Sequence, residues 1–155
     1  MPVAECAAHV AGTGSGAVGD IVQTSGGRVV TAGADGHIAV LDPRRGFERV
    51  AHLPCGDFVY TLAAAGPLAL VGTGSGHVHV VDAEGLGQVR KVGGSNPAGD
   101  DGGGEEGDTA SDEGFGEPRI LYSLGANQAA VRFVAPTANG MIAAGDDGTA
   151  IVYGF

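Results

Sequence analysis

Hydrophobic and polar positions follow a twelve-residue unit that occurs three times in this chain. In each copy a short apolar run leads to a turn of small and polar residues, and a second run rich in β-branched residues follows. The copies span residues 31–42, 71–82 and 143–154. The second copy starts 40 residues after the first, and the third starts 72 residues after the second. This spacing indicates a repeat architecture with one insertion between the second and third copies.

The turn inside each copy ends in glycine, at Asp35-Gly36, Ser75-Gly76 and Asp147-Gly148. Asp-Gly between two β-prone runs is a strong hairpin signal, because both central residues of a two-residue type I′ turn need positive φ. We therefore predict two antiparallel strands around each turn.

Two further β-prone runs precede each copy. The nearer runs are residues 16–22, 57–62 and 130–134, and the farther ones are residues 3–9, 49–53 and 119–124. Glycine or proline interrupts nearly every window of helical length, which disfavours helices. The chain is therefore predicted to be all-β, with twelve short strands in three sets of four.

An acidic, glycine-rich segment at residues 83–118 interrupts the period. It holds nine of the 18 acidic residues, against only Arg90 and Lys91, and its central part, residues 93–114, has no large apolar side chain. Such a segment cannot bury enough surface to offset its ordering entropy. We predict a disordered loop between a third strand and the next outer strand. The domain organisation is then residues 1–82 with two repeats, 83–118 as the insertion, and 119–155 with the third repeat.

Charge and composition limit the classes of binding partner and the cellular location that we expect. The formal net charge is −10 and Lys91 is the only lysine, so no basic patch exists for a nucleic-acid backbone. No secretory signal and no apolar stretch long enough for a membrane is evident. Cys6 and Cys55 form no CxxC motif, which favours buried free thiols in an intracellular protein. We expect a cytoplasmic protein, with the nucleus as the alternative.

Three motifs suggest chemistry but are better explained as structure. Residues 14–19 read GxGxxG, but a β-prone, glycine-broken stretch follows instead of the helix that a dinucleotide site requires. His37, His77 and His79 lack further ligands for zinc. No nucleophile elbow or other activating frame surrounds the serines, histidines and aspartates that could be imagined as a triad, namely Ser75, Ser123, His52 and Asp57. We predict no catalytic, cofactor-binding or metal-binding residue.

The repeats resemble those of WD40 proteins, over nearly the whole chain outside the insertion. Leu41-Asp42 and Val81-Asp82 stand where that family has Trp-Asp, and residues 146–149 (Asp-Asp-Gly-Thr) give the best single match. The family's Gly-His pair near the start of a repeat is absent, so its hydrogen-bonded Asp–His–Ser–Trp arrangement is not expected. The resemblance implies three four-stranded antiparallel blades of a WD40-like β-propeller.

Three blades are fewer than the four to eight that close a propeller. The resemblance therefore implies a partial or open propeller. The chain is expected to be the C-terminal part of a longer propeller, to pair with a second copy of itself, or to remain an open arc.

The function implied by the resemblance is a non-catalytic scaffold for protein–protein interaction. Substrate recognition in a ubiquitin-ligase complex, as part of an F-box/WD40-type protein, is one such role. Partner contacts are expected at arginine and aromatic anchors, and the candidates are Arg44, Arg45, Phe47, Arg90, Tyr122 and Arg132. Two alternatives stay open. A propeller-type, hydrolase-like enzyme fragment would bring His37, His77 and His79 together with acids around one cavity. A self-assembling structural module would pair with itself.

Overall fold

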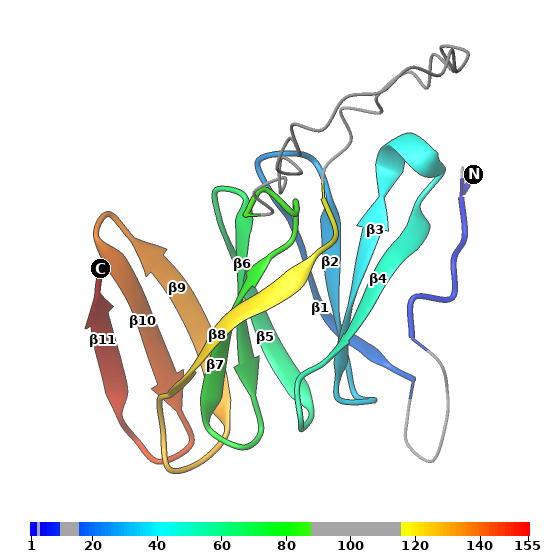
Figure 1. Ribbon diagram of the computed structural model, residues 1–155. Coiled ribbons are helices and arrows are strands. Elements are labelled where there is room, and N and C mark those ends of the chain that lie inside the picture. The colour runs from blue at the N-terminus through cyan, green and yellow to red at the C-terminus, as the bar shows by residue number, and fades with distance from the viewer. Residues whose placement is uncertain (3, 10–15, 88–115) are drawn as a thin grey trace, which may run out of the picture.

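The computed structural model describes residues 1–2, 4–9, 16–87 and 116–155. Within these residues the chain forms eleven β-strands in three antiparallel sheets, together with one short 3-10 helix. The sheets stand in a row in chain order, from blue and cyan through green and yellow to orange and red (Figure 1). The all-β prediction is confirmed.

The first sheet contains four strands in chain order. They are β1 (Val18–Gln23), β2 (Val29–Gly33), β3 (His37–Asp42) and β4 (Glu48–Pro54). The 3-10 helix η1 (Pro43–Arg45) joins β3 to β4. The Asp42 carboxylate accepts a hydrogen bond from the Arg44 backbone N–H, so the aspartate that ends the repeat caps this turn.

The second sheet also has four strands, but the acidic insertion separates its last strand from the others. Its strands are β5 (Val59–Ala65), β6 (Leu68–Thr73), β7 (His77–Asp82) and β8 (Arg119–Gly125). Because β8 pairs with β7, the insertion lies between a third strand and the next outer strand, as the sequence indicated. Residues 88–115, which include its central part and Arg90, lie outside the described residues.

The third sheet has three strands, where the sequence predicted four. They are β9 (Val131–Thr137), β10 (Gly140–Gly145) and β11 (Ala150–Gly154), and the hydrogen-bonding order is β11-β10-β9. The prediction of three four-stranded sheets is therefore wrong for this sheet. Its fourth strand is missing because each outer strand pairs with the preceding repeat, and no described segment pairs with the outer edge of β11.

The glycine turns lie where the sequence placed them, but they are longer than two-residue type I′ turns. In each turn the glycine N–H bonds to the carbonyl three residues before it: Gly36 to Gly33, Gly76 to Thr73 and Gly148 to Gly145. Each closing glycine has positive φ, between 76° and 82°, whereas the residue before it does not. This is the pattern of a turn that closes on a left-handed residue, which explains why glycine is needed at only one position.

Two apolar cores hold the row of sheets together. Val30 and Ile38 of the first sheet share one core with Leu62 and Val71 of the second. Leu70, Val78 and Val80 of the second sheet share the other core with Val131 and Met141 of the third. The second sheet is thus buried on both faces. In β6 the residues from Leu68 to Val71 form a continuous apolar run, whereas β7 combines three buried valines, Val78, Val80 and Val81, with His77 and His79.

A buried polar cluster ties the first sheet to the chain that follows β7. Glu84 is fully buried and accepts a hydrogen bond from the Thr24 hydroxyl. The Arg28 guanidinium, also buried, donates to the carbonyl oxygen of Ala83 and lies 4.0 Å from the Asp42 carboxylate. Ala83 and Glu84, which the sequence assigned to the insertion, are therefore part of the folded structure.

The predicted strand at residues 3–9 is not found in its described part, residues 4–9. This segment instead lies against the outward face of the first sheet, where Ala8 packs with Ala39 and Leu41. Arg49 donates a hydrogen bond to the Ala8 carbonyl at 3.0 Å. Cys55 is buried as expected, but Cys6 is exposed. Among the described residues no helix is long and apolar enough to cross a membrane.

The core between the second and third sheets generates the first prediction. Met141 is fully buried there, so Met141→Ala leaves a cavity and should lower the free energy of unfolding by about 2–5 kcal/mol. Urea denaturation measures this change. Leu86, which is 62% exposed, provides the control, because Leu86→Ala should change the same quantity by less than about 0.5 kcal/mol. Equal effects of the two substitutions would contradict the assignment of this core.

Candidate functional site

The first strand of each sheet carries an extra residue near its start. The register shifts between Val18 and Asp20 in β1, and between Val59 and Thr61 in β5. In β9 the residues on either side of the shift are Val131 and Phe133. The unpaired residues are Gly19, Tyr60 and Arg132. Bulges re-aim side chains and are frequent beside functional sites, and here three of them lie at equivalent positions in neighbouring sheets.

Two of these bulge residues contact each other across the second and third sheets. The Arg132 guanidinium lies over the Tyr60 ring, 4.3 Å from its centroid. The same guanidinium binds the Asp146 carboxylate through Nε at 2.8 Å and through Nη2 at 2.7 Å. This hydrogen bond lowers the pKa of Asp146 and keeps the carboxylate ionised. Arginine and an aromatic ring are thereby held together in an exposed position.

A hollow lies beside Tyr60, at the start of β1 and β5. Its volume is about 240 Å³, and its lining residues are Ala17, Gly19, Ala34, Phe58, Val59 and Tyr60. Gly19 leaves room because it has no side chain. Phe58 and Tyr60 are 49% and 40% exposed, and their ring centroids are 6.4 Å apart. We call the hollow together with Tyr60 and Arg132 the bulge surface.

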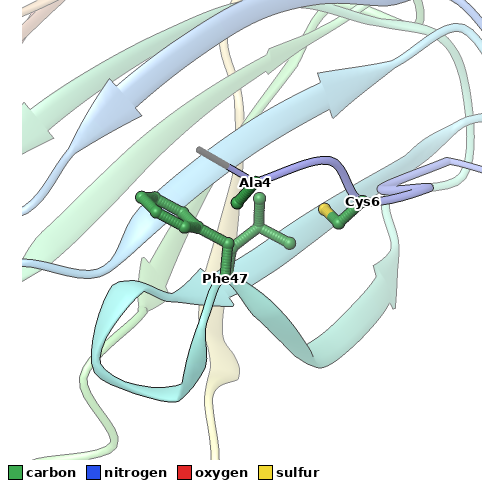
Figure 2. A pocket seen from close by; sticks show the side chains of 4 residues that line it. Ala4, Cys6 and Phe47 are labelled. Carbon is green, nitrogen blue, oxygen red and sulfur yellow. The ribbon is translucent and has the colours of Figure 1, made fainter. Parts of the chain in front are cut away.

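The structure distributes the predicted partner-binding residues over separate places. Arg132 belongs to the bulge surface. Arg44 and Arg45 lie in η1, where Arg44 binds the Asp42 carboxylate at 3.0 Å. Phe47, the residue after that turn, has a φ of 64° and lines a cavity of about 240 Å³ with Leu41. Figure 2 shows Ala4 and Cys6 of the N-terminal segment around the same cavity.

Tyr122 lies in the middle of β8, the edge strand of the second sheet opposite to β5 and Tyr60. It lines a larger cavity, of about 510 Å³, together with Leu68 of β6 and the turn between β9 and β10. Arg90 lies outside the described residues. Sequence reasoning missed Phe58 and Tyr60. Their aromatic character at the start of a strand was visible, but the bulge that exposes Tyr60 is a property of strand pairing.

A second group of polar side chains gathers around Asp35, in the turn between β2 and β3. His9 Nδ1 lies 3.1 Å from both carboxylate oxygens, and His52 Nε2 lies 3.3 Å from Oδ2. Oδ1 accepts a hydrogen bond from the His37 backbone N–H at 3.0 Å. The His37 ring stacks on His52, with centroids 4.3 Å apart. We call His9, Asp35, His37 and His52 the histidine cluster.

Burial and hydrogen bonding set the charges in this cluster. Burial raises the pKa of Asp35, but hydrogen bonds from the His37 backbone and from His9 outweigh it, so the pKa lies below its ordinary value. Burial lowers the pKa of His52, and the partial compensation from Asp35 does not restore it. The cluster therefore holds an ionised carboxylate beside a neutral His52 at neutral pH.

His9 also bonds through its second nitrogen, with Nε2 2.8 Å from the Thr31 hydroxyl. The full Asp–His–Ser–Trp arrangement was not expected, and the sequence has no tryptophan to complete it. His9, Asp35 and Thr31 nevertheless form a three-residue network, with threonine in place of the serine. Asn127 makes the corresponding contact in the third sheet, donating to the Asp147 carboxylate at 3.0 Å. The sequence did not reveal His9, because no Gly-His pair marks it and 26 residues separate it from Asp35.

The other candidate chemical residues are not brought together. His77 Nδ1 pairs with the Ser75 hydroxyl at 3.1 Å. His79, which is buried, pairs through Nδ1 with the Ser123 hydroxyl and through Nε2 with the Cys55 carbonyl at 3.0 Å. His52, the histidine of the imagined triad, lies in the histidine cluster, where it contacts Asp35.

Comparison with known proteins gives no family. No family model matches the chain, and no curated protein matches it. Among solved structures, the computationally designed Ika8 protein is similar with a TM-score of 0.43 and 13% identity, over 90% of this chain and 46% of that chain. The chain thus spans about half the length of Ika8. The designed Ika4 protein gives a TM-score of 0.42 and 13% identity, over 90% of this chain and 92% of that one. Likeness at these TM-scores supports no assignment of function.

The burial of His79 generates a pH prediction. Burial is the largest cause that lowers its pKa below the ordinary value of 6.5, so the unfolded chain binds this proton more readily than the folded one. The neutral His79 imidazole contributes its full stabilisation when the pH is above the ordinary histidine pKa. This contribution is lost as the pH falls through the lowered pKa of the folded state. The free energy of unfolding should therefore fall between about pH 7 and about pH 5.

Chemical denaturation at several pH values measures this dependence. His79→Gln keeps hydrogen-bonding groups but cannot take up a proton, so its free energy of unfolding should depend less steeply on pH. His77→Gln, an exposed neighbour on the same strand, should keep the slope of the unsubstituted protein. An unchanged slope in His79→Gln would refute the assignment.

Proposed function

We propose that this chain is a unit of a WD40-like β-propeller that acts as a non-catalytic scaffold for protein partners. The observation that carries the proposal is the set of three equivalent bulges, which exposes Tyr60 and Arg132 at one end of adjacent sheets. The twelve-residue repeats support the propeller assignment, as do the three antiparallel sheets that follow one another along the chain. So does the His9–Asp35–Thr31 arrangement, which corresponds to part of the hydrogen-bonded set of WD40 repeats.

The bulge surface has the features of a protein-binding site. Interface energy concentrates in a few aromatic and arginine side chains at the centre of a contact, and here Tyr60 and Arg132 already lie against each other. The hollow at Gly19 offers space for an apolar anchor of the partner. Because Asp146 holds Arg132 in place, little side-chain entropy remains to be lost on binding.

The third sheet supports the proposal that the propeller continues beyond this chain. One of its faces packs on the second sheet. The other is largely apolar and presents Phe133, Ala135, Ile142, Ala144, Ala150 and Val152, together with Thr137 at the end of β9. Phe133 and Val152 are 73% and 69% exposed. A bare apolar face beside an unpaired edge strand is what a further blade would cover, either from a longer protein or from a second copy.

The enzymatic alternative required His37, His77 and His79 to converge with acids around one cavity. Instead, His37 stacks on His52 in the histidine cluster, while His77 stacks with His79 in the second sheet, their centroids 6.5 Å apart. This separation favours the scaffold over a hydrolase-like fragment. Substrate recognition in a ubiquitin-ligase complex stays a prediction within the scaffold proposal.

Two tyrosines test the partner-binding surface. Tyr60 and Tyr122 are similarly exposed, at 40% and 42%, but lie on opposite edge strands of the second sheet, β5 and β8. Partners captured from cell extract by the unsubstituted protein should be lost or weakened about tenfold in Tyr60→Ala and in Arg132→Ala. Tyr122→Ala should retain them. Equal binding by all variants, measured by titration with the purified partner, would refute the bulge surface as the site.

The bare face of the third sheet predicts self-association of the isolated chain. Sedimentation velocity should show species larger than the 15.2 kDa monomer, because an exposed apolar sheet face and a free edge strand favour contact with another copy. Val152→Glu places a charge in that face and should shift the chain to monomer, whereas Leu86→Glu, in the exposed stretch after β7, should not. A clean monomer of the unsubstituted chain at micromolar concentration would exclude the self-assembling module.

A further inference from the structure

Three ligand-forming side chains from distant parts of the chain meet beside the first sheet. His9 belongs to the N-terminal segment, Asp35 to the turn between β2 and β3, and His52 to β4. One donor atom from each lies within 4.8 Å of the other two. The arrangement shares no side chain with the bulge surface, and the proposed contacts with a protein partner do not involve it.

The spacing of these atoms fits a small divalent transition metal. Zinc binds imidazole nitrogen and carboxylate oxygen at about 2.0–2.2 Å, so neighbouring ligand atoms of a tetrahedral site lie about 3.3 Å apart. Asp35 Oδ2 lies 3.1 Å from His9 Nδ1 and 3.3 Å from His52 Nε2. The imidazole donor atoms lie within 4.8 Å of each other, and His52, which has to adjust, is a partly exposed side chain on an outer strand.

Neighbouring groups already orient the proposed ligands. The Thr31 hydroxyl lies beside His9 Nε2 and can accept a hydrogen bond from an Nε2–H group, which favours the tautomer whose Nδ1 is free for a metal. The His37 backbone N–H holds the other carboxylate oxygen of Asp35. Gly33 lies directly beneath the pair, since a Cβ there would come within 2.2 Å of His9 Nδ1 and of Asp35 Oδ1. The contact therefore depends on a residue without a side chain.

The third sheet shows that a purely structural bond at this position needs no histidine. There Asn127 donates to Asp147, and Gly145 lies beneath it, with a virtual Cβ 2.8 Å from Asn127 Cγ. The first sheet has an imidazole in the equivalent place and adds a second, His52, to the same carboxylate. In the third sheet the Asn127 amide is enough to join the preceding segment to the turn. A joining role alone therefore does not explain why two imidazoles contact Asp35 in the first sheet.

We propose that His9 Nδ1, Asp35 Oδ2 and His52 Nε2 form a binding site for a divalent transition-metal cation of the zinc class. The side chain of His9 is fully buried, that of Asp35 is 11% exposed and that of His52 is 27% exposed. The site is thus closed on the side of His9 and open to solvent on the side of His52, where a water or an outside ligand completes the coordination. The imidazoles bind as neutral ligands, and the proton on His9 Nδ1 moves to Nε2.

Metal-free protein titrated with Co²⁺ and with Zn²⁺ tests the site. We expect one ion per chain, with Co²⁺ giving the visible absorption of a low-coordinate nitrogen and oxygen site. Zn²⁺ should also raise the melting temperature, because it binds the folded chain. His52→Gln should weaken the affinity for both ions by more than the roughly 10- to 100-fold that loss of an outer-shell partner costs. It should also abolish the rise in melting temperature.

His77→Gln is the matched control, since His77 occupies the position in the second repeat that His37 occupies in the first. It should bind both ions as the unsubstituted chain does. Circular dichroism without metal establishes that His52→Gln is folded, and Asp35→Asn gives a second loss of affinity that does not depend on His52. Absence of stoichiometric binding would show a hydrogen-bond network only. Binding that survives both substitutions would place the ion elsewhere, and either result overturns the proposal.

Discussion

Burial of the second sheet on both faces is the constraint on which the rest of the structure depends. Leu70 and Val71 of β6, and Val80 and Val81 of β7, are successive buried apolar residues that point to opposite faces, so neither face can be left in water. Val71 faces the first sheet and Leu70 the third. The first and third sheets are therefore held as neighbours of one central layer, and each has an outward face with no sheet against it. The N-terminal segment covers part of one such face through Ala8, whereas no segment among the described residues covers the face that contains Val152, which is 69% exposed.

The three repeats differ in how one local contact is made. The segment before a first strand has to be joined to the turn between the second and third strands. His9 bonds to Asp35 in the first repeat, and Asn127 bonds to Asp147 in the third. In the second repeat Ser75 replaces the aspartate, and it bonds within its own turn to the Thr73 hydroxyl. Divergence at this joint is what gives the first repeat its cluster of imidazoles.

The strands were predictable because their signals are local. β-branched runs are separated by turns that end in a glycine with positive φ, as at Gly36 and Gly148. These turn signals do not depend on how the sheets pack. The failures concern pairing between distant segments. Residues 4–9 were expected to form a strand from their place before the first repeat, but they are rich in alanine, which disfavours strands, and no described strand pairs with them. They pack as an irregular segment. Tyr60 becomes a surface anchor only through a register shift, and His9 meets Asp35 only once the first sheet has formed. The predicted anchors Phe47, Tyr122 and Arg132 were chosen because aromatic and arginine side chains are common at interfaces. No local sequence signal could show whether they lie on one surface.

The two proposed sites share one turn, and this has a physical consequence. Ala34 lines the hollow of the bulge surface, and the next residue, Asp35, holds both imidazoles. The Ala34 N–H also bonds to the carbonyl of Ala17 at 3.0 Å, which fixes the turn to the start of the first strand. A cation on Asp35 would restrain this turn, and a partner side chain in the hollow would press against the same backbone. Because linkage is reciprocal, any effect of the cation on partner affinity must appear equally as an effect of the partner on cation affinity. The turn from Gly33 to Gly36 is closed by a hydrogen bond between its ends. A restraint on Asp35 therefore acts directly on its neighbour Ala34 and needs no longer chain of contacts.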